Sequence, residues 1–426
     1  MIDRASVRSA CSASPPADRR PRGPGTATAP VAAKPRASLL GGLALGLTLM
    51  LSACSSPPKA RLEEQRQQRD FAASGYAPSI AAVEIQAINW RLRGEDVRLS
   101  VTSAGGLGGT PRPVVLYLPG LGEAETAGLR WRRAWAAAGY AVLTVQPLEE
   151  DAAAWSSDLA RAAEFNELGR RHYAEAEMRK RLARLDVLLA EAQRLGRQGE
   201  APWRALDWSR AVVAGYELGA QSALALAGER QADGSVLALK TLQARAAIVI
   251  SPQVMSTPDP ERYRALAVPV LSLTGPDDGD LLNMVKDVRW REAPFQAMPA
   301  DRRWLLSVPE VPHAAFAGND PRPETEAEAN ARRRAEAGDG QSQGRRGGGG
   351  RGARGQEGPT RLAPVPAVPD YRRLHQQQLG LIAAQQVSVA FLDLHLKQSD
   401  AARAWLAGPA QAWLGRVGTV SGATAR

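Results

Sequence analysis

A five-residue segment at 215–219 has the composition of a turn that presents a reactive side chain. It reads Gly215-Tyr216-Glu217-Leu218-Gly219, follows an apolar run at 211–214 and precedes a segment rich in small residues. Glycines at both ends permit a tight strand-to-helix turn, which projects the middle side chain over the edge of a sheet. The middle residue of such a turn is commonly serine, whereas here it is Glu217. A carboxylate can act as a nucleophile without a base to remove a proton.

An acidic pair and a histidine follow two later strands, in an order that suits catalysis. The expected strand at 268–273 leads to Asp277 and Asp278, and the expected strand at 304–308 leads to His313. Polar groups at the carboxyl ends of parallel strands meet at one edge of a sheet. We therefore expect an acidic residue and His313 to lie near Glu217.

The loop Pro119-Gly120-Leu121-Gly122 follows an earlier strand and occupies the position of an oxyanion hole. Its donors would be the backbone N–H groups of Leu121 and Leu218, which could hold a developing negative charge. Ser222 lies about one helical turn beyond the elbow at 215–219. We expect Ser222 to point away from these donors, so it is a poor substitute for the missing serine.

On these motifs the sequence resembles the α/β-hydrolase superfamily, over about residues 80–318 and 368–410. The segments PVVLYLPGLG, RAAIVISP, VPVLSLTGPDD and WLLSVPEVPHAAFAG are most similar to dienelactone hydrolases, chlorophyllases and platelet-activating-factor acetylhydrolases. Members of that group are serine-dependent esterases and lipases without a metal or organic cofactor. The resemblance implies that His313 is the base and Asp278 its orienting acid, with Asp277 as the alternative. It also implies a small-molecule or lipid-like substrate and no cofactor.

Glu217 in place of serine leaves three functions open. The first is a working hydrolase in which Glu217 is a nucleophile or the base for a water. A carboxylate nucleophile attacks alkyl carbon in epoxide hydrolases and haloalkane dehalogenases of the same superfamily, and His313 would then activate water against the ester. The second is an inactive protein that binds a lipid, a peptidoglycan fragment or a protein partner in the cleft. The third is a structural lipoprotein of the cell envelope.

Strands and helices alternate through the body of the chain. Two strands with alternating polarity are expected at 83–87 and 97–101, and six continuous apolar runs follow at 114–118, 141–145, 211–214, 246–250, 268–273 and 304–308. Continuous runs are typical of parallel strands buried on both faces. We therefore predict an α/β fold of the α/β-hydrolase type. Its mostly parallel sheet should have about eight strands, helices on both faces and no separate cap domain.

Two segments interrupt this alternation and suggest the domain boundaries. Residues 157–196 are charged and helix-forming, and residues 319–366 are rich in Gly and Arg and are expected to be a disordered insertion. The predicted organisation is as follows: a leader and signal peptide at 1–53, a solvated tether at 54–79, the first part of the hydrolase domain at 80–318, the insertion at 319–366, a helical part of the same domain at 367–414, and a loose tail at 415–426.

The N-terminal region reads as an export signal. An apolar stretch at 38–53 follows Lys34 and Arg36 and ends in Leu51-Ser52-Ala53-Cys54. A short apolar run behind positive charge indicates a signal peptide. Its end resembles the bacterial lipobox, in which the cysteine is acylated, so Cys54 is the predicted lipidation site. Ser55 follows Cys54, which by resemblance to the sorting pattern favours the outer membrane, facing the periplasm.

The charge distribution argues against a nucleic-acid partner. The chain of 426 residues has a formal net charge of +10, but residues 1–60 hold eight Lys and Arg against only two Asp. More than half of the excess thus lies in the predicted leader and tether rather than on a binding face. The two cysteines and four histidines show no metal-ligand spacing. His172, His375 and His395 are expected on helices as surface or packing residues, and the sequence leaves the oligomeric state open.

Overall fold

The protein is described here from a computed structural model, which covers residues 58–76, 82–108, 110–255, 258–319 and 371–423. A single sheet of nine strands runs through the described part, in the order β1-β2-β4-β3-β5-β6-β7-β8-β9. The strands are β1 (Val83–Leu92), β2 (Glu95–Ala104), β3 (Arg112–Leu118), β4 (Ala141–Val145), β5 (Leu206–Tyr216), β6 (Ala246–Ile250), β7 (Val270–Thr274), β8 (Arg303–Ser307) and β9 (Thr419–Gly422).

Helices connect most of these strands. They are α1 (Pro58–Ala73), α2 (Leu129–Ala137), α3 (Glu149–Ala152), α4 (Asp158–Arg161), α5 (Phe165–His172), α6 (Glu175–Arg197), α7 (Leu218–Ala227), α8 (Pro260–Arg264), α9 (Ala293–Ala297), α10 (His313–Phe316), α12 (Tyr371–Leu396), α13 (Asp400–Leu406) and α14 (Pro409–Leu414). Short 3₁₀ helices are η1 (Ala154–Ser156), η2 (Trp203–Ala205) and η3 (Val288–Glu292).

The strand directions establish the fold class. The six strands from β4 across to β8 pair in parallel, whereas β1 and β2 at one edge and β9 at the other pair antiparallel. The chain crosses from β3 to β4 and back to β5, so β3 lies between them. This mostly parallel sheet has the α/β-hydrolase fold, which confirms the fold predicted from the apolar runs.

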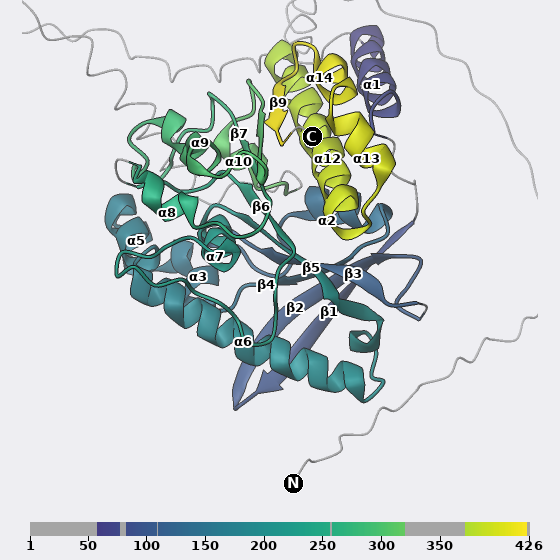
Figure 1. Cartoon of the computed structure of the whole chain (residues 1–426). Coiled ribbons are helices and arrows are strands. Elements are labelled where there is room, and N and C mark those ends of the chain that lie inside the picture. Colours follow the sequence, from purple (N-terminus) through teal and green to yellow (C-terminus); the bar gives the residue numbers. More distant parts are fainter. Residues whose placement is uncertain (1–57, 77–81, 109, 256–257, 320–370, 424–426) are drawn as a thin grey trace, which may run out of the picture. The chain divides into compact units, whose positions relative to one another are not determined.

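Helices cover both faces of the sheet, which explains why the central strands are continuously apolar. Along β3, Val115 and Tyr117 belong to the core under α2, α12, α13 and α14. Val114 and Leu116 belong to the core on the opposite face, under α6 and α7. Figure 1 shows α6 and α12 on opposite sides of the sheet. Every residue of β4, β6 and β7 is buried as a result.

Helix α12 is long and apolar enough to cross a membrane, but it is a core helix of this domain. Of its most apolar window within Arg372–Leu396, 72% is buried inside the protein. Val387, Ala390 and Phe391 are fully buried against the sheet. Its apolar character therefore follows from packing.

Two segments predicted to lie outside the core instead pack onto it. The predicted tether at 54–79 contains α1, whose Phe71 ring stacks on Trp413 with centroids 4.3 Å apart. The Trp413 indole N–H also donates to the Phe71 carbonyl oxygen over 3.0 Å. The predicted loose tail at 415–426 contains β9, which extends the sheet beside β8. Both predictions were wrong because the partner surfaces come from segments distant in the sequence, which local composition does not reveal.

The predicted leader and signal peptide at 1–53, and all but the first residue of the predicted insertion at 319–366, lie outside the described residues. Helix α6, between β4 and β5, packs on the sheet, whereas buried residues of α4 and α5 pack with Leu121 and Leu218.

Candidate active site

The elbow between β5 and α7 holds Glu217 in a strained backbone conformation. Glu217 has φ +52° and ψ −105°, a region that side chains rarely occupy outside functional turns. The two flanking glycines have no room for a side chain. A Cβ on Gly215 would lie 2.2 Å from the Gly219 backbone, and one on Gly219 would lie 1.9 Å from the carbonyl oxygen of Leu118. The structure thus forms the predicted elbow and places Glu217 at its tip.

His313 and Asp278 form a buried hydrogen-bonded pair beside this elbow. His313 Nδ1 lies 2.7 Å from Asp278 Oδ1. The Asp278 carboxylate also accepts hydrogen bonds from the Ser251 hydroxyl at 2.8 Å and from the Thr274 hydroxyl at 2.7 Å. Asp277 points elsewhere and accepts from the Glu310 backbone N–H. The geometry therefore selects Asp278 over Asp277 as the partner of His313.

A buried arginine contacts Asp278 of this pair. The sequence alone did not indicate this residue. The Arg291 side chain is fully buried in η3, and its Nε donates to the Asp278 carbonyl oxygen over 3.0 Å. The same Nε lies 3.5 Å from the Asp278 carboxylate, and Nη1 donates to the Ser251 carbonyl oxygen. Nothing in the local sequence distinguishes Arg291 from the neighbouring Arg289, so this role could not have been predicted.

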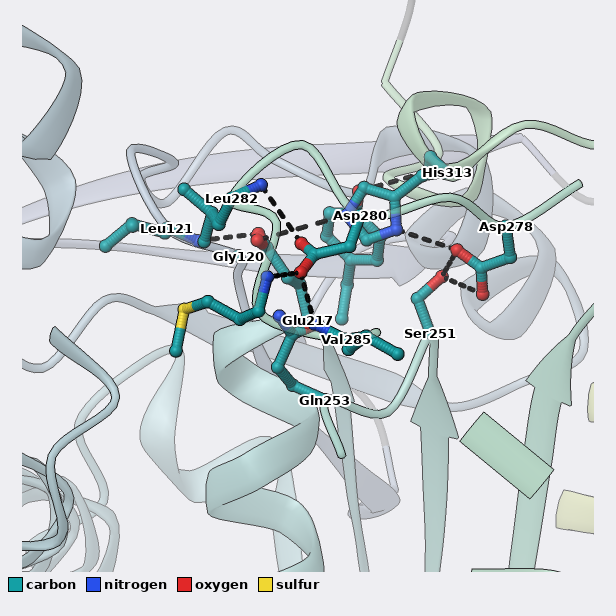
Figure 2. Close-up of polar contacts among 12 residues, drawn as sticks. Gly120, Leu121, Glu217, Ser251, Gln253, Asp278, Asp280, Leu282, Val285 and His313 are labelled. Atoms are coloured by element: carbon teal, nitrogen blue, oxygen red, sulfur yellow. Dashed lines mark hydrogen bonds and ion pairs between the residues drawn. The ribbon is translucent and has the colours of Figure 1, made fainter. Parts of the chain in front are cut away.

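The Glu217 carboxylate occupies the predicted oxyanion position. Its Oε2 accepts a hydrogen bond from the Leu121 backbone N–H over 3.2 Å, and its Oε1 lies 3.9 Å from His313 Nε2. Figure 2 shows Glu217 between the Leu121 backbone and the imidazole of His313. A Cβ on Gly120 would lie 2.9 Å from Oε2, so the loop needs glycine here. The other predicted donor, the Leu218 N–H, belongs to the first residue of α7.

The charges of this site favour a protonated histidine. Burial opposes the charge on His313, but the contacts with Asp278 and Glu217 outweigh it and raise its pKa to about 9. For Asp278, burial alone would raise the pKa. The hydrogen bond from His313 and the charge of Arg291 instead hold it below its usual range. At neutral pH the site therefore holds an imidazolium between two carboxyl groups.

A cluster of buried apolar residues, here called the roof, packs against the elbow and against the loop at 119–122, here called the oxyanion loop. Its buried members come from the segments around 121, 154–173, 218 and 282–284: Leu121, Ala154, Ala160, Leu168, Tyr173, Leu218, Leu282 and Met284. Asp280 fixes the last of these segments, because its carboxylate accepts the backbone N–H groups of Leu282, Met284 and Val285 (Figure 2). Glu217 and His313 are only 6% and 5% exposed. Both side chains are therefore almost completely shielded from solvent.

A second buried network ties this roof to the oxyanion loop. The Asp151 carbonyl oxygen accepts the Gly122 N–H at 2.8 Å, and the Trp155 indole N–H donates to the Leu121 carbonyl oxygen at 3.0 Å. The Asp151 side chain lies 2.6 Å from His172 Nδ1 and 3.3 Å from Arg181 Nη1. His172 is thus buried in a polar network and does not lie on the surface.

The remaining polar candidates lie away from the elbow tip. Ser222 lines a cavity of about 10 Å³ behind the elbow, together with Arg181 and Leu185. His375 contacts Gln68 of α1, and His395 packs edge-on against Phe391. Among the residues that the structure describes, no group of three or more His, Cys, Asp and Glu side chains could hold a metal ion.

No family model and no curated protein matches this chain. Among solved structures, it is similar to a Klebsiella pneumoniae protein described as a dienelactone hydrolase. Identity to that protein is 17%, the match covers 61% of this chain and 99% of that one, and the TM-score is 0.38. Likeness at this level says nothing about activity, and the fold assignment rests on the strand order and the elbow.

Proposed function

We propose that the protein is a hydrolase in which Glu217 is the nucleophile and attacks a saturated carbon of a small ester-like or related substrate. The observation that carries this proposal is the split placement of the Glu217 carboxylate. Oε2 is held by the Leu121 N–H, and Oε1 faces His313. A carboxylate held through one oxygen presents the other for attack. The held oxygen then becomes the carbonyl oxygen of an ester. Attack on an acyl carbon would instead give an anhydride, a poor intermediate.

Hydrolysis of that ester would use the remaining groups of the site. His313, oriented by Asp278 over 2.7 Å, takes a proton from water, and the hydroxide adds to the side-chain carbonyl carbon of Glu217. Negative charge then develops on Oε2, where the Leu121 N–H already points and the Leu218 N–H can join it. Release of the alcohol restores the carboxylate. The added oxygen remains in Glu217.

The charge on Glu217 determines whether His313 is protonated in each of the two steps. While Glu217 is a carboxylate, it is one of the causes that raise the pKa of His313 to about 9, so the imidazole is protonated at neutral pH. Ester formation removes that negative charge, and the pKa of His313 falls. A larger share of the imidazole is then unprotonated and can act as a base when water must be activated.

The test is to trap the ester. His313→Ala removes the base of the second step and leaves the nucleophile, so incubation with 1-bromobutane or 1,2-epoxybutane should leave a stable adduct on the peptide containing Glu217. Glu217→Gln is the matched control and should give no adduct. For the wild-type protein, a single turnover in ¹⁸O-labelled water should place the label in the Glu217 carboxylate. Absence of both adduct and label with every alkyl substrate would contradict the proposal.

One observation favours a second function, an inactive protein that binds a ligand or an envelope partner in the cleft. The Glu217 side chain already fills the position of a product carboxylate, against the Leu121 N–H. Mass spectrometry of the native purified protein distinguishes the two. A bound small molecule together with no adduct on Glu217 would support the binding function.

We further propose that the protein is a lipoprotein of the outer membrane, attached through Cys54 and facing the periplasm. The support is the apolar stretch that ends in Leu51-Ser52-Ala53-Cys54, which lies outside the described residues. Labelled palmitate should enter the wild-type protein, and the label should be lost in Cys54→Ala. Label retained in that variant would contradict lipidation at Cys54.

A further inference from the structure

An open groove beside α6 has no part in the mechanism above. Its cavity volume is about 460 Å³, which is within the range of about 300–1,000 Å³ found for ligand pockets. Three elements line it: α6, the end of β1 with the turn that follows it, and the loop at 240–241. None of the lining residues belongs to the elbow, the oxyanion loop or the loops that carry Asp278 and His313.

Basic side chains predominate among the charged residues of this groove. These residues are Arg93, Asp186, Glu191, Arg194, Arg197 and Lys240. Four basic against two acidic side chains give the groove a net charge of +2. Glu191 and Arg194 neutralise each other in an ion pair at 2.7 Å. Among the residues that the structure describes, the side chains of Arg93, Arg197 and Lys240 make no hydrogen bond and no ion pair.

Exposed basic side chains elsewhere on the domain commonly pair with a carboxylate close by in the sequence. Examples are Arg161 with Asp158, Arg179 with Glu175, Arg264 with Glu261, and Arg289 with Asp287. The three unpaired cations of the groove come from three separate elements. Like charges that line one recess repel one another, and a bound anion relieves that repulsion.

The rest of the lining is largely apolar. Leu92 at the end of β1, together with Val187 and Ala190 of α6, provides it. Val187, Ala190 and Arg194 are three or four residues apart and so lie on one face of α6. A ligand that fits this lining therefore needs apolar groups between its negative charges.

The walls of the groove are held in place by contacts with α6. Asp186 Oδ1 accepts the backbone N–H of Thr241 at 2.9 Å, and Gln193 Nε2 donates to the Thr241 carbonyl oxygen at 2.6 Å. On the other side, Arg184 of α6 pairs with Glu95 of β2 at 2.6 Å. A groove that is formed before binding lowers the ordering cost of association.

We propose that this groove binds an extended acidic segment of a partner protein. The carboxylates of that segment contact Arg93, Arg197 and Lys240, and its aliphatic side chains cover Leu92 and Val187. Charge complementarity is the main argument, because a basic partner would place like charges together. A flat lipid surface does not enter a concave recess, and a phosphate-rich polymer would leave the apolar lining uncovered. The proposal does not depend on the chemistry of the elbow.

The test measures the binding of labelled hexapeptides to the full-length protein by fluorescence polarisation. The acidic probe is Glu-Leu-Glu-Ala-Leu-Glu, and its two controls replace either every Glu by Gln or every Leu by Ser. The acidic probe should bind at least about tenfold more tightly than either control. Raising the ionic strength to about 1 M, where the screening length is about 3 Å, should weaken its binding.

Variants of the protein show whether the groove is the site. The triple change Arg93→Glu, Arg197→Glu and Lys240→Glu should weaken binding of the acidic probe by at least about tenfold. All three side chains are exposed, so the urea midpoint should stay close to that of the wild type. Arg416→Glu is the control, because this arginine is also exposed but does not line the groove. Its effect on binding should be less than about twofold.

Each other outcome would overturn the proposal. Failure of the acidic probe to bind, or equal binding of its Gln counterpart, would show that the groove does not recognise carboxylates. Equal weakening by Arg416→Glu and by the triple change would show a non-specific charge effect. Equal binding of the Ser counterpart would remove the role of the apolar lining. Binding to phosphatidylglycerol vesicles that is stronger than binding to the peptide, and is lost in the triple variant, would assign the groove to a lipid surface instead.

Discussion

The Oε2 atom of Glu217 accepts a hydrogen bond from the Leu121 backbone N–H over 3.2 Å, within the loop that would otherwise hold a substrate oxyanion. The Glu217 side chain is therefore held by the loop beside the elbow. Its other oxygen faces His313, which in turn is bound to Asp278. A serine at this position has a shorter side chain with one oxygen, so it could not present separate oxygens to these two groups.

The first prediction concerns the ionisation of His313. Its pKa is raised from 6.5 to about 9, against the effect of burial, by Asp278 and Glu217. In Glu217→Gln, which keeps the shape and removes the charge, the pKa should fall. Titration of the His313 ring signals by NMR checks this. An unchanged His313 pKa in the variant would mean that Glu217 has no electrostatic contact with the ring.

The same shift predicts how stability depends on pH. A group whose pKa is higher in the folded state binds more protons there, so its contribution is complete below pH 6.5 and is lost as the pH rises through about 9. The loss should be on the order of 3 kcal/mol in the free energy of unfolding. It should be smaller in Glu217→Gln, as measured by urea denaturation at several pH values.

A second prediction concerns Glu229, a buried carboxyl group away from the elbow. Burial raises its pKa from 4.5 to about 7, although Arg262 lies 2.7 Å away and opposes that shift. The folded protein therefore prefers the protonated form, and stability should fall as the pH rises from about 4.5 to 7. Glu229→Gln cannot ionise and should flatten the unfolding free energy over this window. The decrease above pH 7 that is due to His313 should remain. A variant with the wild-type slope below pH 7 would contradict the prediction.

Local sequence was sufficient to predict the parallel strands and the turn at 215–219. Continuous apolar runs predicted the parallel strands, because both faces of β4, β6 and β7 are covered. The glycines at 215 and 219 predicted the elbow, because the backbone atoms around them leave no room for a Cβ. These signals are local, since each depends on a pattern within a few residues.

The parts that could not be predicted depend on contacts between distant segments. Arg291 braces Asp278 from η3, and Tyr173 reaches the elbow from the helical segment between β4 and β5. Likewise, α1 packs where Trp413 is available, more than 300 positions later in the chain. An arginine or a tyrosine in a helical segment has many possible environments, and only the tertiary fold selects one.

A third prediction tests whether the elbow needs its glycines. In Gly219→Ala the new Cβ would lie 1.9 Å from the Leu118 carbonyl oxygen, so the backbone must shift. We expect a loss of about 3 kcal/mol in the free energy of unfolding. Gly108→Ala is the matched control, because a Cβ there meets nothing within 4 Å, and it should be close to neutral. Similar urea midpoints for the two variants would show that the elbow is more tolerant than its geometry implies.

The last prediction is that Glu217→Ser creates esterase activity. The wild-type protein should have little or none on p-nitrophenyl acetate, because Glu217 occupies the Leu121 N–H and keeps His313 protonated. Serine frees that donor and removes the negative charge, so the pKa of His313 falls and the imidazole can accept the serine proton. The gain should be at least about tenfold, or roughly 1.4 kcal/mol in the barrier. Glu217→Ala should show no gain, and a further His313→Ala change should abolish the new activity. Wild-type esterase activity that requires His313 but survives in Glu217→Ala would place the nucleophile elsewhere.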